Sequence, residues 1–301
     1  MKLTRTGGNT WQAVPTAPGE RLRVAVLCSD DPQHAYLVSR ISRELDLVGV
    51  IVEPGAAQQR RLWTRRAWTD ALARAYQVRR QRFTGRSAYR RRYFAALTGA
   101  DAPPAERVRS VDWINSAEAT AHLEELRPDV TVVCGTTYLR SATVAAGGLM
   151  INIHGGHLPE YKGNHCVFFA YLRKDYRRIG ASLHLVAARL DGGALLEVVR
   201  PGIRPQDNDE HLYDRAVHLA IDRLVEILAA LEGGQVLLRT TPQEDTGETF
   251  RHRSRKPHLD LWAWLRIRTG LERVPHLPRE PEPVRCLVPH EPHEPAPHEP
   301  G

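Results

Sequence analysis

The sequence predicts an α/β protein built on an open, mostly parallel β-sheet, and three observations carry that prediction. Residues 22–28 and 47–52 are apolar runs of strand length, and residues 34–45 between them have apolar side chains at helical spacing. A strand, a helix and a second strand within about thirty residues form a βαβ unit, whose strands are parallel. Residues 129–134 and 149–153 are further apolar runs of this kind, so they are expected to extend the same sheet.

The remaining elements follow from the same periodicities: apolar side chains recur every three to four residues in a helix and every second residue in a strand. Glycines at 233 and 234 are expected to end the last long helix. The predicted helices are 113–126, 167–172 and 208–231, the predicted strands are 181–187 and 194–199, and residues 259–267 suit either a short helix or a strand.

Composition changes along the chain suggest how its 301 residues are organised. The polar residues 1–20 are expected to form a flexible N-terminal arm, and residues 21–235 the main domain. Residues 236–274 are expected to be a C-terminal extension that packs on this domain. Residues 275–301 are rich in Pro, Glu and His and end in His-Glu-Pro units, which is typical of a disordered tail.

An arginine-rich segment, about 58–105, interrupts the main domain and is predicted to form two amphipathic helices. Twelve arginines lie between Arg60 and Arg92, where Asp70 is the only acid, and the whole chain has a formal net charge of +7. Such a segment is either a solvated helical face or a surface for an acidic partner. The acidic partners considered are a phosphorylated substrate, an acidic carrier protein and RNA.

Several classes of protein are disfavoured by the sequence. No apolar run approaches the roughly 18 residues of a membrane helix, and no apolar segment of a signal peptide opens the chain. The cysteines are far apart and form no Cys-x-x-Cys pair, which disfavours disulfides and structural zinc. A cytoplasmic protein without a membrane partner or a metal is therefore expected. The cysteines are Cys28, Cys134, Cys166 and Cys286.

The most informative segment is residues 151–163, Ile-Asn-Ile-His-Gly-Gly-His-Leu-Pro-Glu-Tyr-Lys-Gly. Asn152 and His154 lie two residues apart at the end of a predicted strand, so their side chains share one face. An amide and an imidazole side by side can polarise a carbonyl group. Asp191 precedes Gly192 and Gly193 in a predicted loop between strands, and a parallel sheet could return it to the same edge.

These residues resemble the core of folate-dependent formyltransferases. The resemblance rests on the order Asn152, His154, Leu158-Pro159, Lys162-Gly163, His184, Asp191 and Gly193, and covers about residues 20–235. It implies a Rossmann-like sheet with helices on both faces, and an N-formyltransferase of one-carbon metabolism. The sugar and natural-product N-formyltransferases, which take part in natural product biosynthesis, are the closest in type.

The resemblance also implies a reaction and the residues that perform it. 10-Formyltetrahydrofolate supplies the formyl group to a primary amine of a small molecule, without a metal. Asn152 and His154 stabilise the oxyanion, and Asp191 holds His154 charged and relays protons. The folate is expected against two loops, at Gly135, Thr136, Tyr138 and Leu139, and at Val186 and Leu190.

Four residues are expected on the substrate side, and His184 is left between a structural and a functional role. The substrate-side residues are Asp30, His157, Lys162 and His165. Asp30 follows the first strand within Cys-Ser-Asp-Asp-Pro, which lacks the glycines of a phosphate loop. This departure disfavours a phosphoribosylglycinamide acceptor, and the short, irregular C-terminal region disfavours methionyl-tRNA.

The alternatives stay open at this stage. They are a phosphoribosylglycinamide or methionyl-tRNA formyltransferase, a formyltetrahydrofolate hydrolase, and an RNA-binding protein that uses the arginine-rich segment. The amine is open to being phosphorylated, nucleotide-linked or carrier-bound, and the sequence does not determine the oligomeric state.

Overall fold

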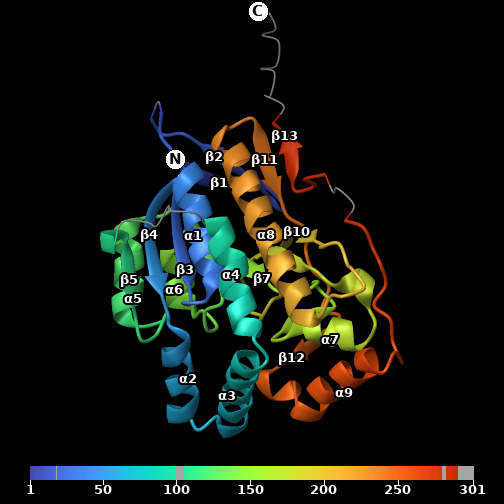
Figure 1. Ribbon diagram of the computed structural model, residues 1–301. Coiled ribbons are helices and arrows are strands. Elements are labelled where there is room, and N and C mark those ends of the chain that lie inside the picture. The colour runs from blue at the N-terminus through green and yellow to red at the C-terminus, as the bar shows by residue number, and fades with distance from the viewer. Residues whose placement is uncertain (18, 99–104, 280–282, 291–301) are drawn as a thin grey trace, which may run out of the picture.

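A seven-stranded sheet forms the centre of the molecule (Figure 1) in the computed structural model, which describes residues 1–17, 19–98, 105–279 and 283–290. Its strand order is β10-β9-β7-β6-β3-β4-β5. All neighbours from β7 to β5 pair in parallel, and β9 pairs antiparallel with both β7 and β10. The predicted open, mostly parallel α/β sheet is confirmed. The strands are β3 (Arg23–Cys28), β4 (Asp46–Val52), β5 (Val108–Ser110), β6 (Val130–Cys134), β7 (Leu149–His154), β9 (Ala181–Leu185) and β10 (Leu195–Val199).

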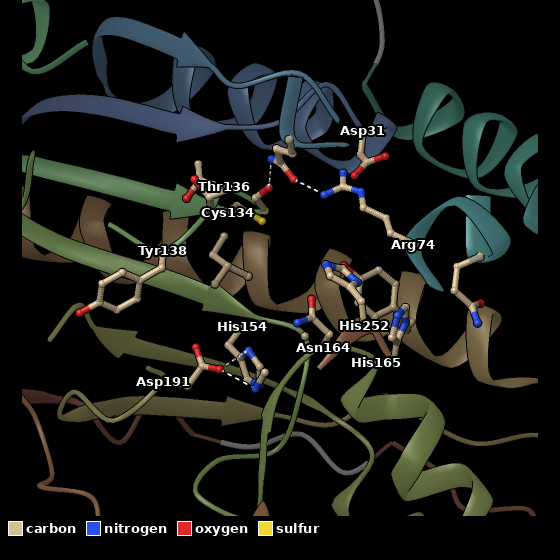
Figure 2. Close-up of a pocket in the computed structure, with 18 of the residues that line it drawn as sticks. Asp31, Arg74, Cys134, Thr136, Tyr138, His154, Asn164, His165, Asp191 and His252 are labelled. Carbon is tan, nitrogen blue, oxygen red and sulfur yellow. Dashed lines mark hydrogen bonds and ion pairs between the residues drawn. The ribbon is translucent and has the colours of Figure 1, made fainter. Parts of the chain in front are cut away.

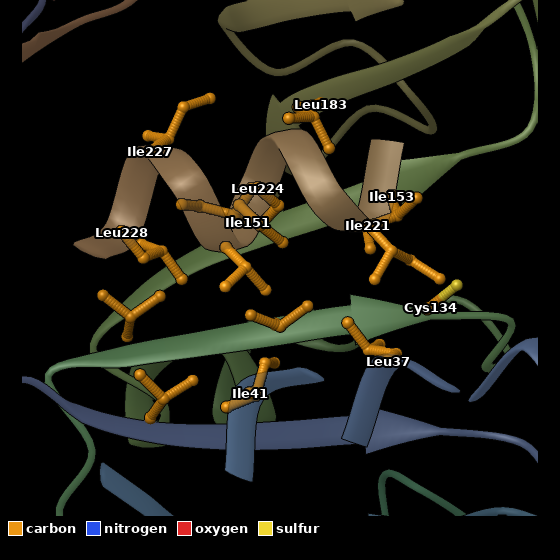
Figure 3. Packing of buried hydrophobic residues seen from close by; sticks show 14 of the residues in the cluster. Leu37, Ile41, Cys134, Ile151, Ile153, Leu183, Ile221, Leu224, Ile227 and Leu228 are labelled. Carbon is orange, nitrogen blue, oxygen red and sulfur yellow. The ribbon is translucent and has the colours of Figure 1, made fainter. Parts of the chain in front are cut away.

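Helices cover both faces of this sheet because its strands alternate between two apolar cores. In β3, Val24 and Val26 join one core, whereas Ala25 and Leu27 join the other. Helices α1 and α8 bury their apolar sides in the first core, and α5 contributes to the second. Figure 3 shows side chains of α1 and α8 turned toward the strands. The helices are α1 (Pro32–Glu44), α5 (Ala117–Leu126), α6 (Ser141–Ala146) and α8 (Asp209–Glu232).

In its described residues, the arginine-rich segment contains three helices instead of the two predicted. They are α2 (Gly55–Thr64), α3 (Trp68–Phe83) and α4 (Arg86–Thr98). The break between α2 and α3 includes Arg66, which has the left-handed φ of 56°. Apolar spacing continued across this break, so the periodicity did not reveal it. Figure 1 shows α2 and α3 beyond the ends of β3 and β4, on the side where the strands' carboxyl ends lie.

Residues expected to be a flexible arm and part of a disordered tail form a second sheet. Strands β1 and β2 make a hairpin, and the sheet order is β1-β2-β11-β13. The polar composition of the N-terminus did not indicate these strands, because their pairing partner is distant in the sequence. Both β2 and β13 pair with β11, which lies more than two hundred residues after β2. Residues 291–301 of the expected tail lie outside the described residues. The strands are β1 (Lys2–Gly7), β2 (Thr10–Val14), β11 (Val236–Arg239) and β13 (Leu287–Pro289).

The segment after β11 returns to the main domain beside residues that follow β7. Phe250 and Ala263 share a buried cluster with Phe168 and Phe169, and the rings of Phe169 and Phe250 stack at 3.9 Å. Residues 259–267, which the sequence left open between a helix and a strand, lie within a helix. No helix among the described residues is long and apolar enough to cross a membrane. The elements of this region are β8 (Tyr161–Gly163), α7 (Cys166–Leu172), β12 (Glu248–Phe250) and α9 (Pro257–Arg268).

Candidate active site

Asn152, His154 and Asp191 meet at the carboxyl end of β7. Asn152 and His154 share a face of the strand, and Nδ1 of His154 lies 3.5 Å from Oδ2 of Asp191. The loop that carries Asp191 joins the antiparallel strands β9 and β10, so it reaches the site by a hairpin and not by the parallel connection expected. Figure 2 shows the Asp191 carboxylate facing the His154 ring.

The His154 ring is held by acceptors at both nitrogens. Nε2 lies 3.0 Å from the carbonyl oxygen of Tyr161, which can only accept, so this nitrogen carries a proton. Nδ1 faces the Asp191 carboxylate, so a second proton there would also meet an acceptor. His154 is only 6% exposed. Acceptors at both nitrogens therefore fix the orientation of the His154 ring beside Asp191.

Asp191 is fixed by contacts to two other segments. The backbone N–H of Gly163 donates to Oδ2 of Asp191 at 2.7 Å, and Gln243 donates to the Asp191 carbonyl oxygen at 3.2 Å. Asp191 has a φ of 51°, an uncommon left-handed conformation for a residue with a side chain. These contacts hold the carboxylate against His154 in spite of the local backbone strain.

His184 positions the amide of Asn152. Its Nδ1 lies 2.8 Å from the carbonyl oxygen of Leu185, so Nδ1 donates and Nε2 is left as an acceptor. Asn152 Nδ2 donates to that Nε2 at 2.9 Å. Burial lowers the pKa of His184 to about 4, which keeps the ring neutral at pH 7. One N–H of the Asn152 amide is thereby engaged, and the other is available to a ligand.

Gly156 leaves the space that the His154 ring needs. A Cβ at this position would lie 2.6 Å from Nε2 of His154 and 2.5 Å from Cβ of Cys166. We therefore expect Gly156→Ala to displace the ring and lower the turnover of the proposed reaction by about 10-fold or more, because small displacements of catalytic groups are costly. Gly233→Ala is the control, since the nearest atom to its Cβ would be 3.3 Å away. Equal steady-state rates for both variants would contradict this role of Gly156.

A cavity of about 760 Å³ has Asn152, His154 and Asp191 in its lining. Gly135, Thr136, Tyr138 and Leu190 of the six expected folate-side residues line it. Leu139 and Val186 do not, because Leu139 is buried in the core beside α5 and Val186 packs against that core. The expectation assigned whole loops to contact with the folate, whereas successive side chains of a loop point in different directions.

Of the four expected substrate-side residues, His165 lines the cavity and the other three do not. Asp30 instead accepts a hydrogen bond at 2.7 Å from the backbone N–H of Gly55, at the start of α2, and its neighbour Asp31 faces the cavity. Nδ1 of His157 lies 3.0 Å from Glu160, and Lys162 donates to Asp245 at 3.1 Å. These three side chains are thus engaged by other parts of the chain.

The structure accounts for several arginines of the α2–α4 segment by a buried ionic network at the start of α8. Glu210 lies 2.7 Å from Arg80, 2.8 Å from Arg90 and 3.7 Å from Arg86. Burial opposes the charge of Glu210, but the surrounding arginines hold its pKa well below the ordinary value. The sequence contains a signal for this network. Arg86 and Arg90 are four residues apart, as are Glu210 and Asp214, so each pair lies on one face of its helix.

In the described part of the chain, no group of three or more His, Cys, Asp or Glu side chains is placed to hold a metal ion. The four cysteines are free and buried. Asn152, His154, His184 and Asp191 bring together an amide, two imidazoles and a carboxylate, which are groups for hydrogen bonding and proton transfer.

Comparison with known proteins relates the chain to a known family. The family model described as "Formyl transferase" matches residues 23–228, which include Asn152, His154 and Asp191. The chain is 32% identical over 162 residues to a methionyl-tRNA formyltransferase of Pseudomonas paraeruginosa, covering 53% of this chain and 51% of that protein. It is 28% identical over 154 residues to the methionyl-tRNA formyltransferase of Latilactobacillus sakei, covering 49% and 46% of the two chains.

A solved structure shares the fold. The phosphoribosylglycinamide formyltransferase of Anaplasma phagocytophilum has a TM-score of 0.50 and 19% sequence identity, over 76% of this chain and 98% of that one. The chain spans about half the length of the curated relatives it matches. The family match covers more than half of the present chain, and the resemblance found in the sequence is confirmed: the chain belongs to the formyl transferase family.

Proposed function

We propose that this protein transfers a formyl group from 10-formyltetrahydrofolate to a primary amine of a small molecule, such as an amino sugar or a natural-product intermediate. The observation that supports this most strongly is the arrangement of Asn152, His154 and Asp191 at one end of a large cavity. All three residues lie within residues 23–228, which the family model matches, and they are the residues on which the sequence resemblance rests.

The cavity fits a folate as co-substrate. Its volume of about 760 Å³ lies within the range of pockets that bind ligands of this size. The backbone at Gly135 has a φ of 73°, and a Cβ there would meet the His34 ring at 2.6 Å, so only glycine keeps this segment of the cavity wall. Thr136, Tyr138 and Leu190 continue the wall beside His154, where a formyl carbon must lie.

In the proposed mechanism the amine nitrogen attacks the formyl carbon and forms the new C–N bond. The free N–H of Asn152 donates to the oxyanion that develops, and the imidazolium of His154 stabilises it by its charge. Asp191 accepts a proton from the attacking amine and, with His154, returns it to the folate nitrogen as the old C–N bond breaks. The products are the formamide and tetrahydrofolate, and no oxidant or reductant is consumed.

An assay with pooled amines tests this proposal. The protein is incubated with 10-formyltetrahydrofolate and amines that include amino sugars, glycinamide ribonucleotide and methionyl-tRNA. Tetrahydrofolate release should depend on the amine, and one or more amines should gain the mass of a formyl group. Release without any amine would identify a hydrolase, and preferred formylation of methionyl-tRNA would replace the small-molecule acceptor.

Binding of RNA in place of catalysis is tested separately. Arg80, Arg86 and Arg90 of the α2–α4 segment are engaged by carboxylates of the chain itself. We therefore expect no tight complex with RNA in a gel-shift assay at physiological salt. A salt-sensitive complex of the kind that phosphate contacts give would support the RNA-binding alternative.

A further inference from the structure

Arg74 of α3 faces the cavity without a carboxylate partner. Its Nη1 donates to Oε1 of Gln58 at 2.7 Å, and its Nη2 donates to the carbonyl oxygen of Gly55 at 3.3 Å. Both acceptors are neutral, and no ion pair joins Arg74 to any carboxylate in the described part of the chain. Arg80, Arg86 and Arg90, which are also partly buried, all have carboxylate partners.

Burial in this arrangement disfavours the charged form of Arg74. Burial lowers the pKa of its guanidinium, and the carboxylates of Asp31, Glu53 and Asp30 offset the effect only in part. Asp31 lines the same cavity but lies beyond ion-pair distance. A guanidinium removed from water gains most from an anion that enters the cavity and takes a fixed position beside it.

Two histidines and an amide extend the surface around Arg74. Figure 2 shows Asn164, His165 and His252 on the same side of His154 as Arg74, with Tyr138 on the other side. The rings of His165 and His252 lie 5.7 Å apart. Nε2 of His165 and Nδ1 of His252 are buried without a hydrogen-bond partner.

Both imidazoles are neutral at pH 7. Burial and the charge of Arg74 lower the pKa of His252 to about 4, and burial with the charge of Arg255 lowers that of His165 well below its ordinary value. Three carboxylates face this group. Asp70, which acts on His252, is paired with Arg253, and Glu210 is paired with Arg80 and Arg90. Asp31 lines the same cavity and forms no ion pair among the described residues. Arg74 is thus a cationic side chain beside these two imidazoles that has no ion pair among the described residues.

We propose that Arg74, with Asn164, His165 and His252, forms a subsite for an anionic group, a phosphate or a carboxylate, carried by the amine that receives the formyl group. This assignment rests on the proposed function. It explains why Arg74 faces the cavity without an ion pair, whereas Arg80, Arg86 and Arg90 of the same segment are held by carboxylates. A guanidinium suits the planar pair of oxygens that both anions present.

Matched pairs of amines test the subsite through catalysis. O-Phosphoethanolamine is compared with ethanolamine, and glycine with methylamine, so that the phosphate and carboxylate arms are read separately. We expect at least one anionic member to exceed its neutral partner about 10- to 100-fold in kcat/KM, the range for a charge-assisted hydrogen bond. Arg74→Gln should remove that preference, and Arg74→Lys should retain part of it.

The control for this arm is Arg79→Gln, which removes the same charge from an exposed position of α3 outside the cavity lining. It should keep the preference for the anionic amine. A preference that survives in Arg74→Gln would overturn the subsite. A rise in KM for 10-formyltetrahydrofolate in place of the amine would assign the anion to the folate and would also overturn it.

A binding arm needs no catalysis. Titration of the protein with inorganic phosphate, and separately with acetate, is followed through the NMR signal of the His252 ring. Phosphate or acetate beside Arg74 should raise the pKa of His252 from about 4, and this response should be absent in Arg74→Gln. Equal responses in both proteins would contradict the subsite. A normal response without formyl transfer would leave the subsite standing and reject the proposed function.

Discussion

Replacing His154 by alanine is expected to lower kcat of the proposed formyl transfer by about 10³-fold or more. In the proposed mechanism the His154 ring contributes both stabilisation of the oxyanion and a path for the proton, and each effect is typically worth a factor of about 10² or more. The change removes the group that lies 3.5 Å from Asp191 and 3.0 Å from the Tyr161 carbonyl oxygen. Single-turnover measurements with saturating folate would separate this loss from weaker binding.

Asn152→Ala and Asp191→Asn should show losses of the same kind for different reasons. Asn152→Ala removes the donor to the oxyanion, which is worth a factor of about 10² to 10³. Asp191→Asn keeps the shape but removes the charge that faces Nδ1 of His154 and the acceptor for the amine proton. The control is His157→Ala, a histidine next to the same motif that lies outside the cavity lining.

All of these variants should unfold at temperatures close to that of the unchanged protein. His157→Ala should also keep a turnover rate close to that of the unchanged protein. Near-normal turnover in Asn152→Ala, His154→Ala or Asp191→Asn would refute the assignment of that residue. A large loss in His157→Ala would show that the motif acts through its fold and not through the residues that face the cavity.

Glu210→Ala is expected to destabilise the fold by about 3–5 kcal/mol, the cost of removing one partner from a buried ionic network. Glu210 is 5% exposed and is shared by Arg80 and Arg90. Its removal leaves these guanidinium groups without their central anion and weakens the attachment of α3 and α4 to α8. Unfolding by urea, monitored by circular dichroism, gives the free energy of unfolding of each variant.

The control is Glu248→Ala, which breaks the exposed pair between Glu248 and Arg173. Their side chains are 55% and 45% exposed, so we expect a loss below about 1 kcal/mol. Equal losses in the two variants would mean that the network at Glu210 is not specifically stabilising.

The pH dependence of stability provides an independent check on Glu210. The arginines lower the pKa of its carboxyl group in the folded protein below the ordinary value of 4.5. The unfolded chain therefore binds the proton more readily, so the stabilisation is complete well above pH 4.5 and is lost as the pH falls below it. Glu210→Gln should show a smaller loss of stability on acidification than the unchanged protein; an identical pH profile would contradict the shift.

The central sheet could be predicted because its strands are short and almost continuously apolar. All five residues of β6 are buried, so the run Val-Thr-Val-Val-Cys itself indicates a strand covered on both faces. The hairpin of β1 and β2 could not be found in this way. Its residues are largely exposed or half-buried, and β2 depends on pairing with β11, which lies far along the chain.

The candidate catalytic group of Asn152, His154 and Asp191 was more predictable than the rest of the cavity. Asn152 and His154 share a strand face by simple alternation, and Asp191 precedes two glycines in a loop. The role of His184 depends on which of its nitrogens meets the Leu185 carbonyl oxygen, a detail that sequence spacing does not contain. Asp30 and Asp31 are adjacent in sequence, and only the backbone geometry decides that Asp31 faces the cavity.

Arg74 shows the same limit in the α2–α4 segment. Twelve arginines between residues 60 and 92 are indistinguishable by composition. Three-dimensional structure separates Arg80, Arg86 and Arg90, which are bound to carboxylates of α8, from Arg74, which faces the cavity. The sequence identified a cationic segment, and its division into structural and ligand-facing residues required the fold.

The most direct test of formyl transfer follows the formyl group itself. 10-Formyltetrahydrofolate with an isotope label in its formyl carbon is mixed with the protein and an amine that the pooled assay identifies. The label should appear in the formamide product in an amount equal to the tetrahydrofolate released, and neither product should form with Asp191→Asn. Label recovered as formate, with the amine unchanged, would contradict the proposed transfer.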